Sequence, residues 1–413
     1  MNRVWGIIND YSLLLVCGAL LALVWANTAP DSYHHLVHLT LWQGGPVGAL
    51  DPDGGRVLTL HYLINDMAMA LFFAMAAKEV WEAMILEGGS LRGRKALTPL
   101  IATAGGMIGP VVVYLGLAAV LGLLPAVAHG WAIPTATDIA FSYLVGRVVF
   151  GARHPAIGFL LLLAIADDAA GLVILAIFYP SGPLAPAWLL LSLAAALAVF
   201  GLANWLPRRM DRGRQDRPHS TWMRRRAGPW PYVIAGALSW YGFQQAGLHP
   251  ALGLLPVIPA IPHADREFGI FAEAEAHQTD LLNVIEHALK VPVQFVLFTF
   301  GLLNAGVEFG AIAAPTWLVL AGLLIGKPLG ITLMGGLAAG PLRLGLPEGM
   351  KRRDLFLVGC ISGIGFTVAL FVASVAFPPG PVQDAAKMGA LFSLGGSALS
   401  ILAGRILGAE RRN

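Results

Sequence analysis

Two adjacent carboxylates, Asp167 and Asp168, lie near the middle of an apolar run that extends from about residue 156 to residue 178. An ionised side chain at membrane depth costs about 3 kcal/mol even on the most lenient insertion scale, so each one needs a physical reason. Neighbouring helical positions point about 100° apart, so one carboxylate can bind a cation while the other meets a different group. A carboxylate that holds either a proton or a metal cation is a competitive exchange site. The alternative is a structural pair neutralised by a bound cation.

Among the other ionisable residues inside apolar runs, the candidates are Asp66 and Glu79 near residues 58–86, Asp138 near residues 131–150, and Lys327 near residues 316–340. A single lysine does not account for two or three buried aspartates, which favours a functional site over a structural one.

Two of the apolar runs are interrupted. The run from Gly130 to Phe141 contains Pro134 and two threonines, so a continuous helix is not expected there. The run from Gly359 to Val368 is interrupted by Gly363 and Gly365. Paired interruptions in two halves of a membrane protein predict a midplane site built from half-helix ends, where an acidic side chain offsets N-terminal dipoles and a lysine offsets C-terminal ones. For each glycine pair alone, close helix packing is an equal alternative.

The composition indicates which kind of protein must position these groups. The chain has 413 residues, of which 57% are hydrophobic and 12% charged, and its mean hydropathy is +0.70. Soluble domains carry roughly 25% charged residues, so a cytosolic enzyme, a disordered regulator and a DNA-binding domain are excluded. We expect an all-α polytopic membrane protein, a single transmembrane domain over residues 1–413. Its apolar segments number about twelve, near residues 11–29, 58–86, 96–123, 131–150, 156–178, 185–206, 230–246, 248–262, 286–307, 316–340, 354–377 and 384–407.

Basic residues gather in alternate gaps between these segments. The richest gap, an Arg-rich loop at about residues 207–229, holds eight arginines between Arg208 and Arg226. The gaps at residues 180–186 and 377–381 hold none, so the positive-inside rule places both termini in the cytoplasm. The first segment has no convincing cleavage site and is interpreted as a retained span. A patch for lipid headgroups or nucleic acid is the alternative interpretation of the Arg-rich loop.

An alternating pattern near residues 39–61 predicts a small periplasmic β-hairpin. Leu39–Trp42 and Val57–His61 flank the turn residues Asp51–Gly55. A lone hairpin is marginal in water, so it packs either against the membrane domain or against a second copy of the chain. We favour the second arrangement and expect a homodimer. The two cysteines, Cys17 and Cys360, lie in apolar runs and form no disulfide framework.

Four motifs carry a resemblance to a known family. They are TATDIAF at Thr135–Phe141, IADDAA at Ile165–Ala170, LIGKPLGI at Leu324–Ile331 and SGIGFTVALFVASVAF at Ser362–Phe377. Together they resemble the NhaA-type sodium/proton antiporters of bacterial inner membranes, from the first span to the last. The resemblance implies twelve spans with inverted repeats, the third to fifth against the tenth to twelfth, and broken, crossing fourth and eleventh spans. It also implies electrogenic export of Na⁺ or Li⁺ in exchange for a larger number of protons, with no cofactor and no nucleic-acid partner.

The resemblance assigns roles to individual residues. Asp168 and Asp167 are the implied carriers of Na⁺ and protons, Thr137 and Asp138 lie at the crossing, and Lys327 pairs with Asp167 when the cation is absent. The chain departs from the family at the cytoplasmic side, where Ala77-Lys78-Glu79 is followed by Trp81 and Glu82. The positions associated with pH response are Glu79, Glu82, Glu286, His287, Lys290 and His249. The exchange chemistry follows from the resemblance, whereas the pH set-point does not.

Three other functions compete with antiport. An intramembrane aspartyl protease could use Asp138 and Asp167, but its usual Gly-x-Gly-Asp signature is absent because Gly363-Ile-Gly365 is followed by Phe366. A membrane serine protease at Ser362 would lack an intramembrane histidine as its base. A sodium-coupled symporter of an organic solute would keep the aspartate pair as its sodium site.

Overall fold

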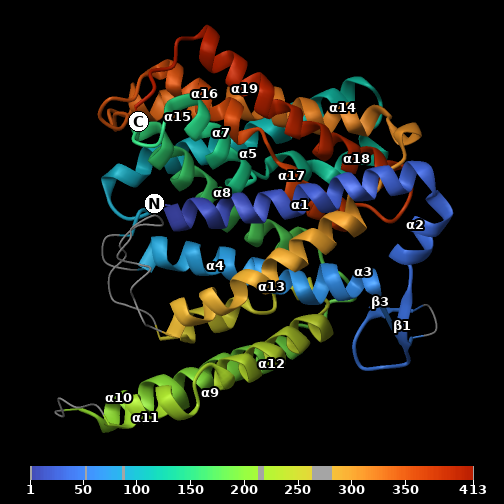
Figure 1. Cartoon of the computed structure of the whole chain (residues 1–413), viewed down its shortest axis with the longest axis vertical. Coiled ribbons are helices and arrows are strands. Elements are labelled where there is room, and N and C mark those ends of the chain that lie inside the picture. Colours follow the sequence, from blue (N-terminus) through green and yellow to red (C-terminus); the bar gives the residue numbers. More distant parts are fainter. Residues whose placement is uncertain (1, 52–53, 86–88, 213–217, 263–280, 413) are drawn as a thin grey trace. The chain divides into compact units, whose positions relative to one another are not determined.

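The computed structural model describes residues 2–51, 54–85, 89–212, 218–262 and 281–412, and these are predominantly helical (Figure 1). Within this described part, seven helices are long and apolar enough to cross a membrane: Leu60–Ile85, Ala96–Val120, Pro155–Phe178, Pro186–Met210, Val284–Asn304, Ala314–Ala339 and Pro381–Ile406. Arg352–Ser362 and Phe366–Ala376 form an eighth candidate that is bent by 50°. Three of the other four expected segments contain shorter apolar helices within the described residues, Leu14–Thr28, Ile139–Phe150 and Pro250–Ala260, and the fourth contains the helix Trp230–Ala246.

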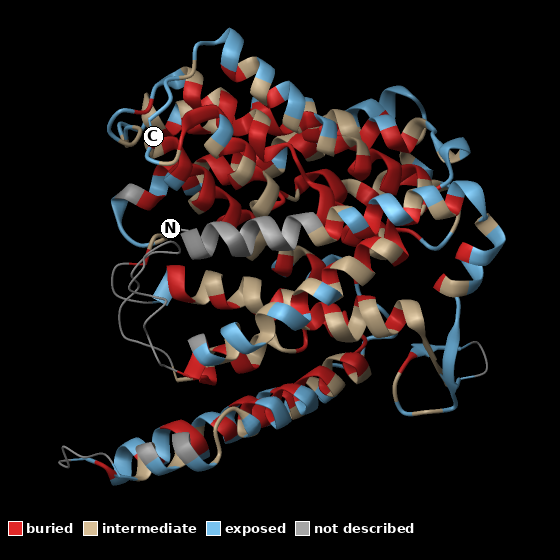
Figure 2. Ribbon diagram, viewed as in Figure 1, coloured by how far each residue is buried: buried red, intermediate tan, exposed pale blue. Residues whose placement is uncertain are grey.

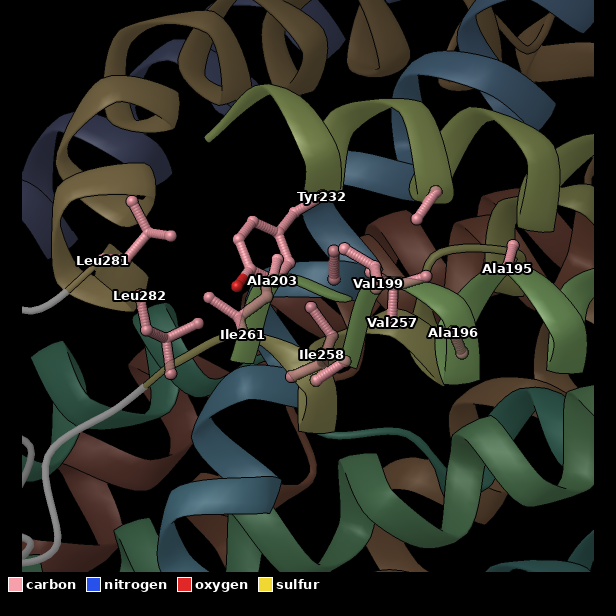
Figure 3. Close-up of a cluster of buried hydrophobic side chains, with 13 residues drawn as sticks. Ala195, Ala196, Val199, Ala203, Tyr232, Val257, Ile258, Ile261, Leu281 and Leu282 are labelled. Atoms are coloured by element: carbon pink, nitrogen blue, oxygen red, sulfur yellow. The ribbon is translucent and has the colours of Figure 1, made fainter. Parts of the chain in front are cut away.

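The chain divides into two compact units, which we describe separately. The first unit comprises His35–Gly89 and Leu175–Leu297, and the second comprises Asn2–His34, Ser90–Ile174 and Phe298–Asn413. In the first unit α9 (Leu189–Val199) and α12 (Trp230–Ala246) lie side by side (Figure 1). Their contact, together with α4 (Met69–Ile85), encloses a buried apolar cluster that includes Tyr232 and Ile258 (Figure 3).

The first unit also contains a small sheet at the predicted hairpin. Strands β1 (Thr40–Gln43), β2 (Ala49–Leu50) and β3 (Arg56–Thr59) are antiparallel in the order β1-β3-β2. The sequence pattern predicts two strands, and the third forms because Gly44 and Gly48 adopt positive φ and turn the chain back. Residues 52–53 of the predicted tip lie outside the described residues.

The Arg-rich loop begins with α10 (Leu206–Met210) and continues with α11 (Pro218–Arg226), while residues 213–217 lie outside the described part. The Asp211 carboxylate accepts hydrogen bonds from the backbone nitrogens of His219 (3.0 Å) and Ser220 (2.7 Å). Burial raises the pKa of Asp211, but the hydrogen bonds from Ser220 and His219 outweigh it and hold that pKa below its usual range. Asp211 therefore joins the two helices as a charged capping group.

In the second unit, α5 (Arg94–Val120) packs along α15 (Lys327–Ala339), which also contacts α16 (Arg352–Ser362). The backbones of α5 and α15 approach so closely that a Cβ added at Gly105 would collide with the carbonyl oxygen of Gly330. Helix α17 (Phe366–Ala376) is largely apolar and is buried along most of its length (Figure 2). This packing fixes the start of α15, where Lys327 lies.

Both interrupted runs are interrupted in the structure. A 3₁₀ helix, Ala128–Thr135, ends before α7 (Ile139–Phe150) begins, with extended backbone at Ala136 and Asp138. Helix α16 ends at Ser362, and α17 begins after a short break. A Cβ at Gly363 would lie 2.6 Å from the carbonyl oxygen of Leu323, so this break requires a residue without a side chain.

Candidate functional site

The two central carboxylates belong to the second unit and lie on one uninterrupted helix, α8 (Pro155–Phe178). Asp167 is buried, with 5% of its surface exposed, whereas Asp168 is partly buried. Oδ2 of Asp167 accepts hydrogen bonds from Nζ of Lys327 (2.6 Å) and from Oγ1 of Thr137 (2.6 Å). Oδ1 of Asp167 is buried and has no hydrogen-bond partner in the protein. One oxygen of the carboxylate is thus doubly bound, and the other keeps its acceptor capacity.

The lysine of this pair is completely buried. Lys327 is 0% exposed and is the first residue of α15, directly after the π-helical segment Gly322–Gly326. Its ammonium donates to the carboxylate of Asp167 and to the backbone carbonyl of Thr135. A buried ammonium requires a charged partner and further acceptors, and both are present here. Lys327 therefore neutralises Asp167 and also satisfies the end of the 3₁₀ helix.

Asp138 connects the two interrupted runs. It is the N-cap of α7, and its Oδ1 accepts a hydrogen bond from the backbone nitrogen of Phe141 (3.2 Å). Its Oδ2 accepts from the backbone nitrogen of Thr367 (3.2 Å) and from the Thr367 hydroxyl. Because Thr367 lies in the first turn of α17, one carboxylate caps two helix N-termini.

The carbonyl end of α16 faces the same region. Oγ1 of Thr137 lies 3.2 Å from the carbonyl oxygen of Ser362, and the hydroxyl of Ser142 donates to the carbonyl of Ile361 (3.1 Å). The backbone nitrogen of Asp138 donates to the carbonyl of Ile364 (2.7 Å). The two breaks are therefore joined by hydrogen bonds in which hydroxyl and carbonyl oxygens predominate. Such oxygens are suitable ligands for a hard cation.

The first unit holds a second buried ion cluster. Nζ of Lys78 lies 2.7 Å from Glu82 on the same helix and 2.8 Å from Glu286 on α13 (Leu281–Asn304). Lys78 and Glu82 are each 7% exposed. Two of the predicted pH-response residues thus meet through Lys78, which the sequence analysis treated only as a departure from the family. Glu79 follows Lys78 on α4.

The remaining predicted pH-response residues also lie in the first unit. His287 follows Glu286 on α13 and is exposed, and Lys290 lies about one turn further along that helix. His249 is buried, and its Nε2 lies 3.8 Å from Oδ1 of Asp66. Its Nδ1 accepts a hydrogen bond from the backbone nitrogen of Ala251 (3.3 Å). Asp66 lies on a π-helical segment, Leu63–Ala68.

Sequence reasoning missed three residues of the central site: Thr135, Thr367 and Ser362 as a backbone acceptor. Thr367 could have been found, because the first turn after a helix break leaves backbone nitrogens free and an aspartate is a common partner for them. Lys78 and Glu82 could also have been paired from their spacing of four residues.

Comparisons with known proteins cover nearly the whole chain. A family model described as Na⁺/H⁺ antiporter 1 matches residues 8–407. The Na(+)/H(+) antiporter NhaA of Jannaschia sp. (strain CCS1) is 66% identical, with 100% of each chain covered. The protein of the same name from Desulfitobacterium hafniense (strain DSM 10664 / DCB-2) is 45% identical over 98% of this chain and 96% of its own.

A solved structure was also matched. The sodium proton antiporter MjNhaP1 from Methanocaldococcus jannaschii is 16% identical, with a TM-score of 0.47 over 97% of this chain and 98% of that chain.

Proposed function

The chain belongs to the Na⁺/H⁺ antiporter 1 family and exchanges sodium ions for protons across a membrane, and we propose that Asp167 and Asp168 carry the exchanged ions. The protein is a transporter and not an enzyme. The observation that carries the proposal is the buried Asp167 carboxylate, bound on one oxygen by Lys327 and Thr137 and unpartnered on the other. Asp168 follows it on the same helix and is less buried.

Competition between cations drives the exchange. In the sodium-free state Lys327 neutralises Asp167, and a proton occupies Asp168. When Na⁺ or Li⁺ binds, the two carboxylates and the Thr137 hydroxyl supply oxygen ligands, and Lys327 gives up its contact with Asp167. Release of one proton from Asp168 and of a second from the Lys327–Asp167 pair for each monovalent cation bound makes the exchange electrogenic, with more protons entering than sodium ions leaving. No cofactor takes part.

The interrupted helices give the site its mobility. In this proposal the fourth and eleventh spans of a twelve-span, inverted-repeat fold cross near the membrane midplane. Asp138 offsets the N-terminal dipoles there and Lys327 offsets the opposite ends, so the half-helices can shift without exposing unpaired charge. The ion-binding site is then accessible from the cytoplasm and from the periplasm in alternation.

The first unit responds to pH in this proposal. The titratable groups assigned to this role are Lys78 with Glu82 and Glu286, the neighbouring Glu79, His287 and Lys290, and buried His249 with partly buried Asp66. The protein operates in the bacterial inner membrane with both termini in the cytoplasm, as the distribution of arginine and lysine predicts.

Exchange in everted vesicles tests the ion-binding assignment. Dequenching of a pH-reporting dye on addition of Na⁺ or Li⁺, without any organic solute, measures antiport directly and excludes an obligatory symporter. Asp168→Asn is expected to abolish the signal, since the amide can neither lose a proton nor neutralise a cation. Asp31→Asn, at an exposed position of α2 (Pro30–Val37), is the matched control and should transport normally. Wild-type dequenching by Asp168→Asn at normal expression refutes the assignment.

The small sheet is proposed as a dimer contact. Strand β1 is exposed along its length and lies at an edge, where unpaired backbone groups can bind a second copy across a two-fold axis. Deleting residues 45–54 is expected to yield monomers that still exchange ions, because the ion-binding residues all belong to one chain. Light scattering of the purified variant measures this, and an unchanged dimer mass would contradict the proposal.

A further inference from the structure

Ser362 has an unusual hydroxyl group. It is the last residue of α16 and is 0% exposed, and its Oγ has no hydrogen-bond partner in the protein. Helical hydroxyls elsewhere in the second unit donate to the carbonyl four residues earlier, as Thr103 does to Pro99 (3.0 Å) and Thr332 to Pro328 (2.6 Å). Ser362 does not use this option, although a buried hydroxyl without a partner is unfavourable.

The unpartnered hydroxyl belongs to the ion-binding region. Oγ1 of Thr137 lies 2.6 Å from Oδ2 of Asp167 and 3.2 Å from the carbonyl oxygen of Ser362, so one hydroxyl bridges the two residues. The buried side-chain polar atoms that have no hydrogen-bond partner among the described residues include Oδ1 of Asp167 and Oγ of Ser362. Both therefore belong to residues that Thr137 contacts.

Three features of this arrangement suit a cation. The free atoms are oxygens, which a hard monovalent cation prefers over nitrogen or sulfur. The C-terminal end of α16 carries partial negative charge from the helix dipole. The Lys327 ammonium already lies against Asp167, so the region accommodates one positive charge. A metal cation can take the place of that ammonium.

We propose that the Ser362 hydroxyl is a further oxygen ligand of the transported Na⁺ or Li⁺, bound at the step where the ion replaces Lys327 at Asp167. This inference rests on the proposed role of the aspartate pair. Ser362 then sets the apparent affinity for the ion, while the two carboxylates perform the proton exchange. In the sodium-free state, neither the Ser362 hydroxyl nor Oδ1 of Asp167 has a hydrogen-bond partner, so both oxygens are available to the ion.

A series of substitutions at Ser362 separates ligation from packing. Ser362→Ala removes the hydroxyl, and Ser362→Cys keeps the shape but replaces the oxygen with a soft sulfur that binds Na⁺ poorly. Ser362→Thr keeps the hydroxyl. Ser400→Ala is the matched control, because Ser400 on α19 (Gly396–Ile406) is also buried and unpartnered but has no hydrogen bond to the site.

Dye dequenching in everted vesicles, titrated with Na⁺ and Li⁺ at constant pH, gives the apparent KM and the maximal rate. We expect Ser362→Ala and Ser362→Cys to raise the KM for Na⁺ about tenfold with a near-normal maximal rate. Ser362→Thr should stay within about twofold of wild type, and Ser400→Ala should not differ from it. The KM for Li⁺ should move in the same direction.

Two outcomes overturn the inference. One is an unchanged KM in both Ser362→Ala and Ser362→Cys, and the other is a loss of maximal rate alone, as a packing defect would produce. Asp168→Asn is measured in the same vesicles as a reference. If it abolishes exchange while the Ser362 variants keep the wild-type KM, only the ligand role of Ser362 fails. If it transports normally, the aspartate assignment fails as well.

Discussion

Two buried lysines, Lys327 in the second unit and Lys78 in the first, are both paired with carboxylates but differ in the number of carboxylates that contact them. Lys327 has one carboxylate, Asp167, at 2.6 Å and is 0% exposed. Lys78 has two, Glu82 at 2.7 Å and Glu286 at 2.8 Å, and is 7% exposed. Losing one partner leaves Lys327 with no carboxylate in direct contact but leaves Lys78 still paired. In the proposed exchange, a single partner suits a contact that breaks during transport, whereas two partners suit a contact that persists.

The strongest test of this comparison removes Lys327. Lys327→Ala leaves the Asp167 carboxylate buried without its cation, and breaking such a pair destabilises proteins by about 3–5 kcal/mol. We expect a clear drop of the melting temperature in detergent and a change from electrogenic to electroneutral exchange. Thermal unfolding of the purified protein and transport under an imposed membrane potential measure the two effects.

The double variant Lys327→Met with Asp167→Asn is the control for charge balance. Because no unpaired charge remains, it should recover most of the melting temperature lost in Lys327→Ala while remaining inactive in exchange. A Lys327→Ala protein that melts at the wild-type temperature would argue against the pairing itself.

A smaller effect is expected from the cluster at Lys78. Glu286→Gln or Glu82→Gln alone leaves one carboxylate on the lysine and should lower stability by about 1–2 kcal/mol. The double variant Glu82→Gln with Glu286→Gln leaves the buried ammonium without a carboxylate. Its loss of stability should exceed the sum of the losses in the two single variants. Thermal or denaturant unfolding of all three variants gives this coupling. Simple additivity would mean that the two carboxylates do not share the lysine.

The contrast between the two clusters also shows what the sequence can reveal. Asp138, Asp167 and Lys327 are conspicuous because charged residues are rare in apolar runs. Their partners are not conspicuous, since hydroxyl and carbonyl groups are common in such runs. Thr367 binds Asp138 from 229 positions away and Lys327 binds Asp167 from 160, distances at which spacing carries no information.

The same limit applies to the fold. Hydropathy predicted a helical membrane protein, and the seven long apolar helices with one bent pair agree with that class. It did not predict strand β2, because Ala49–Leu50 is too short to produce an alternating pattern. Hydropathy also cannot place the ends of helices such as α12, which has 17 residues, so the count of twelve spans stays a prediction.

We expect the smallest effect on stability at an ion pair that is exposed to solvent. Glu410 binds Lys351 and lies 3.4 Å from Arg353, with 46% of its side chain exposed. Exposed ion pairs contribute little and are screened by salt, so Glu410→Gln should shift the melting temperature by about 1 °C or less. The backbone hydrogen bonds that join Arg412 to Phe150 (2.8 Å) and to Arg153 (3.0 Å) hold the C-terminal segment without the carboxylate.

The pH dependence of that small effect has a definite sign. The hydrogen bond from Lys351, and the positive charge of Lys351, Arg353 and Arg412, lower the pKa of Glu410. An acid whose pKa is lowered by folding stabilises the protein above its unfolded pKa, about 4.3 for glutamate, and loses that effect as pH falls through the lowered value. Any difference between wild type and Glu410→Gln should therefore be present at pH 7, constant through the neutral range, and absent in strong acid or in about 1 M salt. A shift as large as that of Lys327→Ala would show that burial is not what separates the two ion pairs.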